Sequence, residues 1–197
     1  MCRQSAVQAM SGVGQVLSMA RARRWWLAAG LCVAAVLAAT IGTFLLQSPS
    51  WNQVNLWIDL RYADVASISP AQLATQWESA QSPNTQPLLL DVRTAAEFAV
   101  SHLPGARHVD TEQVLDFAER ELAQLDRAHP IIVYCSVGVR SAAAARDLQL
   151  AGFTQVKNVR GSIFQWANEG RALEGGHLVH PYNAQWGQLL RADLHSE

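Results

Sequence analysis

The feature that most constrains this chain is a long apolar segment near its N-terminus. No charged residue occurs between Arg24 and Asp59, and residues 25–46 are almost entirely apolar. A helix needs roughly 20 such residues to cross a bilayer, so the segment predicts one transmembrane helix. We therefore expect an N-terminal tail at residues 1–24, a membrane span at residues 25–46, and a folded part beyond it.

The charges on the two sides of this segment predict its orientation. Arg21, Arg23 and Arg24 directly precede it, whereas all 16 acidic residues of the chain follow it. Because a positively charged flank is retained in the cytoplasm, we expect a single-pass protein of the cell inner membrane, with a cytoplasmic N-terminus and its domain on the periplasmic, extracytoplasmic side. A cleaved signal peptide is the alternative, but its apolar core usually has about 7 to 15 residues and this run is longer.

Charge and cysteine content exclude several classes of function. The formal net charge is −1 and the sequence shows no basic stripe, which argues against nucleic acid as a partner. Of the three cysteines only Cys135 follows the apolar segment, so no internal disulfide is expected there. His177, His180 and His195 lack metal-ligand spacing, and we predict neither a metal nor a cofactor.

The folded part begins after a predicted juxtamembrane linker at residues 47–64. Trp51, Trp57 and Leu60 make this linker too apolar for a freely solvated tether, so we expect it to pack on the domain or lie at the membrane surface. Beyond it, apolar runs alternate with segments of helical periodicity. This alternation predicts an α/β fold with a central parallel sheet flanked by helices and a ligand site at the carboxyl ends of the strands. The predicted strands are residues 88–92, 107–109, 131–134 and 156–159, and the predicted helices are residues 70–78, a short one after Thr94, then 112–125, 140–150 and 164–169.

Cys135 stands at the end of the most strand-like segment, before a short loop and a helix start. Backbone N–H groups and the helix dipole stabilise a thiolate in such a position and lower its pKa. Gly138 allows the loop a left-handed backbone, and Arg140 adds positive charge. The alternative interpretation is a buried structural cysteine, because free cysteines are often buried.

Four sequence motifs, in order along the chain, together resemble the rhodanese-like sulfurtransferase family. The resemblance implies a single rhodanese-like domain at residues 65–175, followed by a C-terminal tail at residues 176–197. This sequence departs from the family pattern in two turns. The family often has Gly-Gly where this chain has Gly161-Ser162, and Gly where it has Ser101. The motifs are Leu90-Asp91-Val92-Arg93 with Glu97-Phe98, His102-Leu103-Pro104-Gly105-Ala106, Ile132-Val133-Tyr134-Cys135-Ser136-Val137-Gly138-Val139-Arg140-Ser141, and Val159-Arg160-Gly161-Ser162 with Trp166.

The resemblance also implies roles for individual residues. Cys135 is expected to be the nucleophile that carries a persulfide, with Arg140 holding an anionic donor. Glu97 is expected to cap a helix, His102 to lie in a turn, and Trp166 to belong to the core. The predicted substrate-binding loop is Ser136, Val137, Gly138, Val139 and Arg140, and the predicted supporting residues are Asp91, Arg93 and Ser141.

The resulting hypothesis is a membrane-anchored sulfurtransferase that moves sulfane sulfur from a donor such as thiosulfate to a thiol or cyanide acceptor. Whether a protein serves as acceptor stays open. A cysteine-dependent phosphatase or arsenate reductase is one alternative, although those enzymes place five residues between cysteine and arginine, whereas four separate Cys135 from Arg140. A non-enzymatic, membrane-tethered interaction module is the other alternative.

Overall fold

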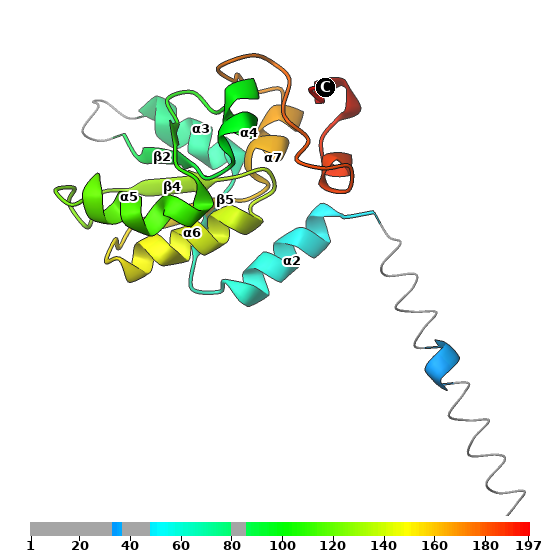
Figure 1. Cartoon of the computed structure of the whole chain (residues 1–197), viewed down its shortest axis with the longest axis horizontal. Coiled ribbons are helices and arrows are strands. Elements are labelled where there is room, and N and C mark those ends of the chain that lie inside the picture. Colours follow the sequence, from blue (N-terminus) through cyan, green and yellow to red (C-terminus); the bar gives the residue numbers. More distant parts are fainter. Residues whose placement is uncertain (1–32, 37–47, 80–85) are drawn as a thin grey trace, which may run out of the picture. The chain divides into compact units, whose positions relative to one another are not determined.

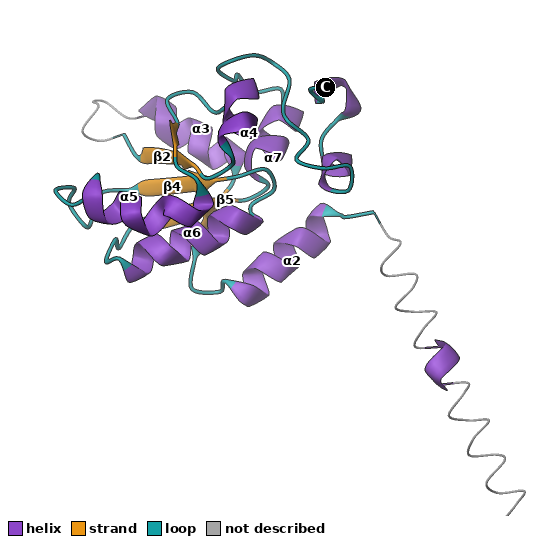
Figure 2. Cartoon of the chain, viewed as in Figure 1, coloured by secondary structure: helices purple, strands orange, loops and turns teal. Residues whose placement is uncertain are grey.

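The computed structural model describes residues 33–36, 48–79 and 86–197. Ser48–Glu197 form one compact unit, built on a five-stranded sheet with helices on both faces (Figures 1 and 2). The strand order is β1-β5-β4-β2-β3, and every pair is parallel. The predicted α/β fold with a central parallel sheet is thus confirmed.

Four of the five strands fall within the predicted ranges, and β1 is an additional short strand. They are β1 (Ala66–Ile68), β2 (Leu88–Asp91), β3 (Arg107–His108), β4 (Ile131–Tyr134) and β5 (Val156–Val159). The α-helices of the compact unit are α2 (Trp51–Arg61), α3 (Pro70–Ser79), α4 (Ala95–Val100), α5 (Val114–Arg120), α6 (Val139–Leu150) and α7 (Ser162–Asn168). Three 3-10 turns complete the described elements: η1 (Thr111–Gln113), η2 (Trp186–Leu189) and η3 (Ala192–Leu194).

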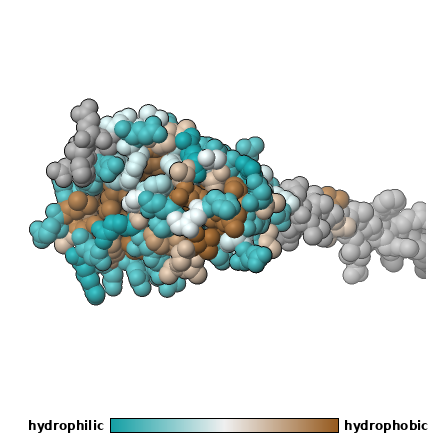
Figure 3. Space-filling view, turned by 90° about the horizontal axis from the view of Figure 1, so that it is seen from above, coloured by the Kyte–Doolittle hydropathy of each residue, from teal (hydrophilic) through white to brown (hydrophobic). Residues whose placement is uncertain are grey.

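Two hydrophobic clusters hold the sheet between its helices. Side chains alternate along a strand, so Ile132 and Tyr134 of β4 enter one cluster while Ile131 and Val133 enter the other. The first cluster includes residues of α2, α3 and α7, and the second is formed with α5 and α6. Burial on both faces explains why the central strand β4 is continuously apolar. Figure 3 shows apolar patches among polar residues on one face of the molecule.

The predicted linker contains helix α2, which the sequence analysis did not predict, and it packs on the domain, one of the two positions expected for it. Ser50 caps the helix with its side chain, and Val54 and Ile58 are buried one turn apart. Residues four apart lie on the same side of a helix, so this pair packs α2 onto the domain. Not all apolar residues of the helix are buried in this way, since Trp57 and Leu60 stay exposed.

The C-terminal segment also folds onto the domain. Val179, Leu189 and Leu190 are buried, and the Ser101 hydroxyl donates a hydrogen bond of 2.6 Å to the carbonyl of Leu178. The amide of Asn168, at the end of α7, donates to the carbonyl of Leu189. Residues 176–197 are therefore part of the folded unit, although their sequence has no regular hydrophobic period.

Helix α5 is shorter than the predicted helix at residues 112–125. A 3-10 turn precedes it, and the chain leaves helical geometry after Arg120. The hydroxyl of Thr111, the first residue of this turn, donates a hydrogen bond of 2.6 Å to the carbonyl of Val92. Thr111 thus contacts the segment directly after β2 and does not cap the helix with its side chain.

The predicted membrane span at residues 25–46 lies outside the described residues except for residues 33–36, which are helical. The predicted tail at residues 1–24 also lies outside them. Within the described part of the chain, no helix combines the length and apolar character that crossing a bilayer requires.

Candidate active site

The predicted loop joins the carboxyl end of β4 to helix α6. Gly138 directly precedes the helix with a φ of 105°, a left-handed conformation that side chains disfavour. A Cβ at this position would come within 3.3 Å of Ile58 and 3.4 Å of the carbonyl of Val159. This backbone turns the N–H of Gly138 toward the Cys135 thiol, at 3.1 Å from Sγ.

The Cys135 thiol lies in a buried, electropositive environment. Its residue is only 1% exposed, and Sγ faces the Ser141 hydroxyl at 3.4 Å in addition to the Gly138 amide. Burial raises the pKa of Cys135, but the charge of Arg140 and the hydrogen bonds from Ser141 and Gly138 outweigh it, so the pKa lies below its ordinary value. The thiolate is the reactive form of cysteine, and this environment favours it.

Arg140 binds a carboxylate that the sequence interpretation treated only as a helix cap. Glu97 forms the expected capping box with Thr94, yet its carboxylate also accepts hydrogen bonds of 2.9 and 2.7 Å from Arg140 and one of 2.8 Å from Ser136. Burial by itself raises the pKa of Glu97, but these hydrogen bonds have the larger effect and lower the pKa to about 2. Glu97 therefore compensates the charge of Arg140, and donor binding by Arg140 stays a prediction.

Asp91 and Arg93 form a fully buried ion pair at the end of β2. Nη2 of Arg93 lies 2.7 Å from the Asp91 carboxylate and donates a hydrogen bond of 2.6 Å to the carbonyl of Ser101. The pair connects the end of the strand to the turn after α4. Such a position suits the predicted supporting role. Neither residue lines the Cys135 pocket.

The sequence analysis missed two residues that support the loop from β5 and from the start of α7, as well as the two aromatic residues of the C-terminal segment described below. Asn158, buried in β5, accepts a hydrogen bond of 2.7 Å from Ser141 and donates one of 3.0 Å to the carbonyl of Gly138. Ser162 accepts a hydrogen bond of 3.1 Å from the N–H of Cys135 and has a φ of 48°, where the family often has glycine. The signal that could have marked Asn158 is its polar side chain directly before Val159, in a strand that the sequence predicts to lie inside the sheet.

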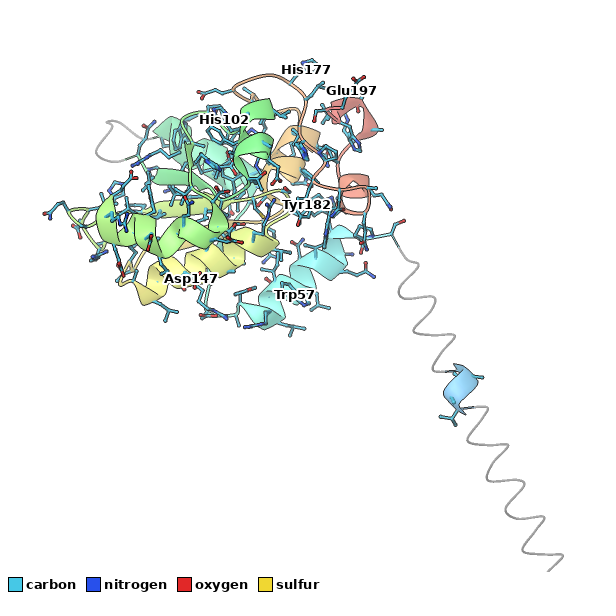
Figure 4. The ribbon with its side chains drawn as sticks, viewed as in Figure 1. Trp57, His102, Asp147, His177, Tyr182 and Glu197 are labelled. Atoms are coloured by element: carbon cyan, nitrogen blue, oxygen red, sulfur yellow. The ribbon has the colours of Figure 1, made fainter. Side chains whose placement is uncertain are left out.

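The C-terminal segment completes the pocket of Cys135. Tyr182 and Trp186 line it together with the loop residues Cys135, Ser136, Val137, Val139 and Arg140, around a cavity of about 90 Å³. The centroid of the Tyr182 ring lies 4.6 Å from Cζ of Arg140, a cation–π arrangement. Figure 4 shows Tyr182 on the side of the domain where the C-terminal segment lies.

His102 and Trp166 lie outside this pocket. The His102 ring stacks on Phe98 at a centroid distance of 3.9 Å and approaches the Glu174 carboxylate at 3.3 Å. Trp166 is buried, and its indole N–H donates to the carbonyl of Ala172. Trp166 belongs to the core, as predicted, whereas His102 directly precedes the turn at residues 103–106 and forms a bridge with Glu174.

Comparison with known proteins identifies related domains. A model of the rhodanese-like domain matches residues 72–169. The chain is 32% identical over 105 residues to a thiosulfate sulfurtransferase GlpE of Actinobacillus succinogenes, an overlap of 53% of this chain and 89% of the relative. It is 38% identical over 89 residues to thiosulfate sulfurtransferase 16, chloroplastic, of Arabidopsis thaliana, covering 41% of this chain and 74% of the relative.

A solved structure supports the same assignment. The crystal structure of a thiosulfate sulfurtransferase from Pseudomonas aeruginosa superimposes with a TM-score of 0.51 at 25% identity, covering 61% of this chain and 22% of that chain. The loop after β4, the parallel sheet and these matches agree with the motifs in the sequence. This chain therefore belongs to the rhodanese-like family.

Proposed function

We propose that the protein is a sulfurtransferase in which Cys135 carries sulfane sulfur as a persulfide. The observation that carries the proposal is the position of Sγ, which faces the Gly138 N–H at 3.1 Å and the Ser141 hydroxyl at 3.4 Å inside a small pocket. These donors, with the charge of Arg140, stabilise sulfur in its anionic form. The similarity to thiosulfate sulfurtransferases supports the same chemistry.

With thiosulfate as the donor, the first half-reaction is a displacement at sulfur. The Cys135 thiolate attacks the outer sulfur of thiosulfate, a new S–S bond forms, and the old S–S bond breaks. Sulfite departs with the electron pair of the broken bond, and Cys135 is left as a persulfide anion. No external oxidant or proton transfer is required, because an anion enters and an anion leaves.

The second half-reaction returns the enzyme to its starting state. Cyanide attacks the terminal sulfur of the persulfide, thiocyanate leaves, and the Cys135 thiolate takes the electron pair of the S–S bond. A thiol acceptor would react as its thiolate by the same displacement and leave as a persulfide. Because the enzyme carries the sulfur between the two steps, the kinetics are expected to be ping-pong.

Mass spectrometry of the protein purified without reductant tests the persulfide directly. We expect an adduct of about 32 Da on the peptide that contains Cys135, removed by cyanide and restored by thiosulfate. Cys135→Ser should abolish loading and transfer, whereas Cys32→Ser is the matched control and should retain both. An unmodified Cys135 that thiosulfate fails to load would overturn the proposal in favour of a binding module.

An aryl phosphate assay tests the alternative enzyme class. The proposed sulfurtransferase should leave the phosphate ester intact. Turnover that disappears in Cys135→Ser would replace sulfur transfer by phosphatase chemistry.

We also propose that residues 25–46 anchor the protein in the inner membrane and place the domain outside the cytoplasm. The support is the arrangement of charges, with arginines before the apolar segment and all acidic residues after it. A reporter that matures only after export, fused after Glu197, should be active. An inactive reporter, together with a fluorescent cytoplasmic reporter at the same position, would overturn this location and leave the sulfur chemistry unaffected.

A further inference from the structure

The C-terminal segment has a feature that the rhodanese-like match does not contain, because that match ends at residue 169. We propose that Tyr182 and Trp186 form a roof over Cys135 that restricts the site to small sulfur donors and acceptors. The substrate class rests on the proposed sulfur transfer through Cys135. The steric restriction itself rests only on the geometry of the pocket.

Access to the Cys135 thiol is limited by the residues that line its pocket. The residue is 1% exposed, and it lines a cavity together with Tyr182 and Trp186. The cavity has a volume of about 90 Å³. Pockets for drug-sized ligands have about 300–1,000 Å³, so this one accommodates only a few non-hydrogen atoms.

Tyr182 is placed over the loop by a backbone conformation that side chains disfavour. Its φ is 64°, and Tyr182 and Ser162 are the two non-glycine residues with positive φ in the described part of the chain. A strained residue persists only where its surroundings determine its position. Here the ring packs on the Arg140 guanidinium, which is itself held by Glu97. The position of the ring is thus coupled to the loop that contains the thiol.

Hydrogen bonds within the C-terminal segment hold the roof in shape. The side-chain oxygen of Asn183 accepts hydrogen bonds of 3.0 and 2.9 Å from the N–H groups of Gln185 and Trp186. Gly187 lies so close to Pro181 that a Cβ would be 3.0 Å from the proline ring. The segment is anchored beyond this turn by buried Leu189 and Leu190. The two aromatic residues therefore stand on a folded support.

The small pocket points to a substrate class. Thiosulfate, cyanide and a low-molecular-weight thiol or persulfide can place their reacting atom at Sγ with few accompanying atoms. A cysteine on the surface of a folded protein brings its own backbone and neighbouring side chains to the same opening. With the roof in place, we expect the site to discriminate against such protein thiols.

Alkylation of Cys135 tests the roof without using enzymatic activity. The full-length protein is treated with N-ethylmaleimide or with fluorescein maleimide, which share one reacting group and differ in size, and modification is followed on the Cys135 peptide. The ratio of the bulky to the small rate constant should rise at least about tenfold in Tyr182→Ala, which corresponds to about 1.4 kcal/mol. Tyr182→Phe keeps the ring and should restore the low ratio.

Control variants separate the roof from a general loss of structure. Trp57→Ala removes an exposed aromatic side chain of α2 away from the pocket and should leave the ratio low. Trp186→Ala should raise the ratio further, and Tyr182→Ala carries the test if Trp186→Ala does not fold. An equal ratio of alkylation rate constants in the wild-type protein, Tyr182→Ala and Tyr182→Phe would overturn the proposal that Tyr182 and Trp186 restrict access to Cys135.

Steady-state kinetics then test the substrate class. The kcat/KM for a reduced protein dithiol such as thioredoxin, relative to that for cyanide, should rise at least about tenfold in Tyr182→Ala. Active sulfur transfer with an unchanged ratio would reject the roof and retain the proposed function. A changed alkylation ratio in a protein that never loads sulfur would reject the proposed function and retain the roof.

Discussion

The loop around Cys135 and the C-terminal segment that covers it contribute to the same pocket in different ways. The loop is continuous in sequence, and its amide, hydroxyl and guanidinium groups surround the thiol within the residues 135–141. The C-terminal segment reaches the pocket from more than forty residues further along the chain, with two aromatic side chains. The groups that contact the thiol are therefore close together in the chain, whereas two of the side chains that line its pocket belong to a distant segment.

The largest expected effect comes from breaking the Glu97–Arg140 pair that supports the loop. Arg140→Ala leaves a carboxylate that is 2% exposed without its main partner, and we expect a loss of about 2–4 kcal/mol in the free energy of unfolding, because the arginine is itself partly solvated. Denaturant unfolding measures this loss. An effect below about 0.5 kcal/mol would show that the pair does not stabilise the loop.

Glu97 also predicts a pH dependence of stability. Its pKa in the folded protein is about 2, below the ordinary value of 4.5, so its stabilising contribution is complete above the ordinary pKa and declines as the pH falls from about 4.5 toward 2. Glu97→Gln should flatten the stability profile in that range. An identical acid profile in Glu97→Gln would contradict the assigned role of this carboxylate.

Ser141→Ala should have an intermediate effect on both stability and reactivity. It leaves the buried Asn158 oxygen without its 2.7 Å donor, which costs about 1–3 kcal/mol. It also removes a hydroxyl that lowers the pKa of Cys135, so the pH profile of alkylation by N-ethylmaleimide should shift to higher pH. A profile that shifts to lower pH, or stays in place, would exclude Ser141 as a stabiliser of the thiolate.

Variants of Ser162 separate strain from hydrogen bonding in the support of the loop. Ser162→Ala loses the acceptor for the Cys135 N–H and keeps the left-handed backbone, whereas Ser162→Gly loses the acceptor and relieves the strain. The glycine variant should therefore be more stable than the alanine variant by about 1 kcal/mol. Equal melting curves for the two variants would argue against strain at this residue.

The smallest effect on stability is expected in the roof. Tyr182 is 44% exposed, and Tyr182→Gly exchanges a cation–π contact of about 0.5–1 kcal/mol for relief of a left-handed residue of similar size. The free energy of unfolding should change by less than about 0.5 kcal/mol, while the accessibility of Cys135 increases. A large destabilisation would make Tyr182 a structural residue comparable to those of the loop.

Local patterns were sufficient for much of the fold. The buried strands are continuous apolar runs, and Thr94 and Glu97 identify a capping box, so their secondary structure follows from neighbouring residues. Helix α2 was not predicted because its two buried positions, Val54 and Ile58, occur among apolar residues that stay exposed. Its pattern therefore lacked a clear apolar face, and only packing against the domain decided its form.

The sequence by itself determined the α/β fold and the place of Cys135 between a strand and a helix, because both depend on residues close together in the chain. Only the tertiary structure decided the partners of that cysteine loop. Glu97 reaches Arg140 across 43 residues of sequence, and Ser162 reaches Cys135 across 27. Such pairings depend on the order of strands in the sheet, which leaves no period in the sequence.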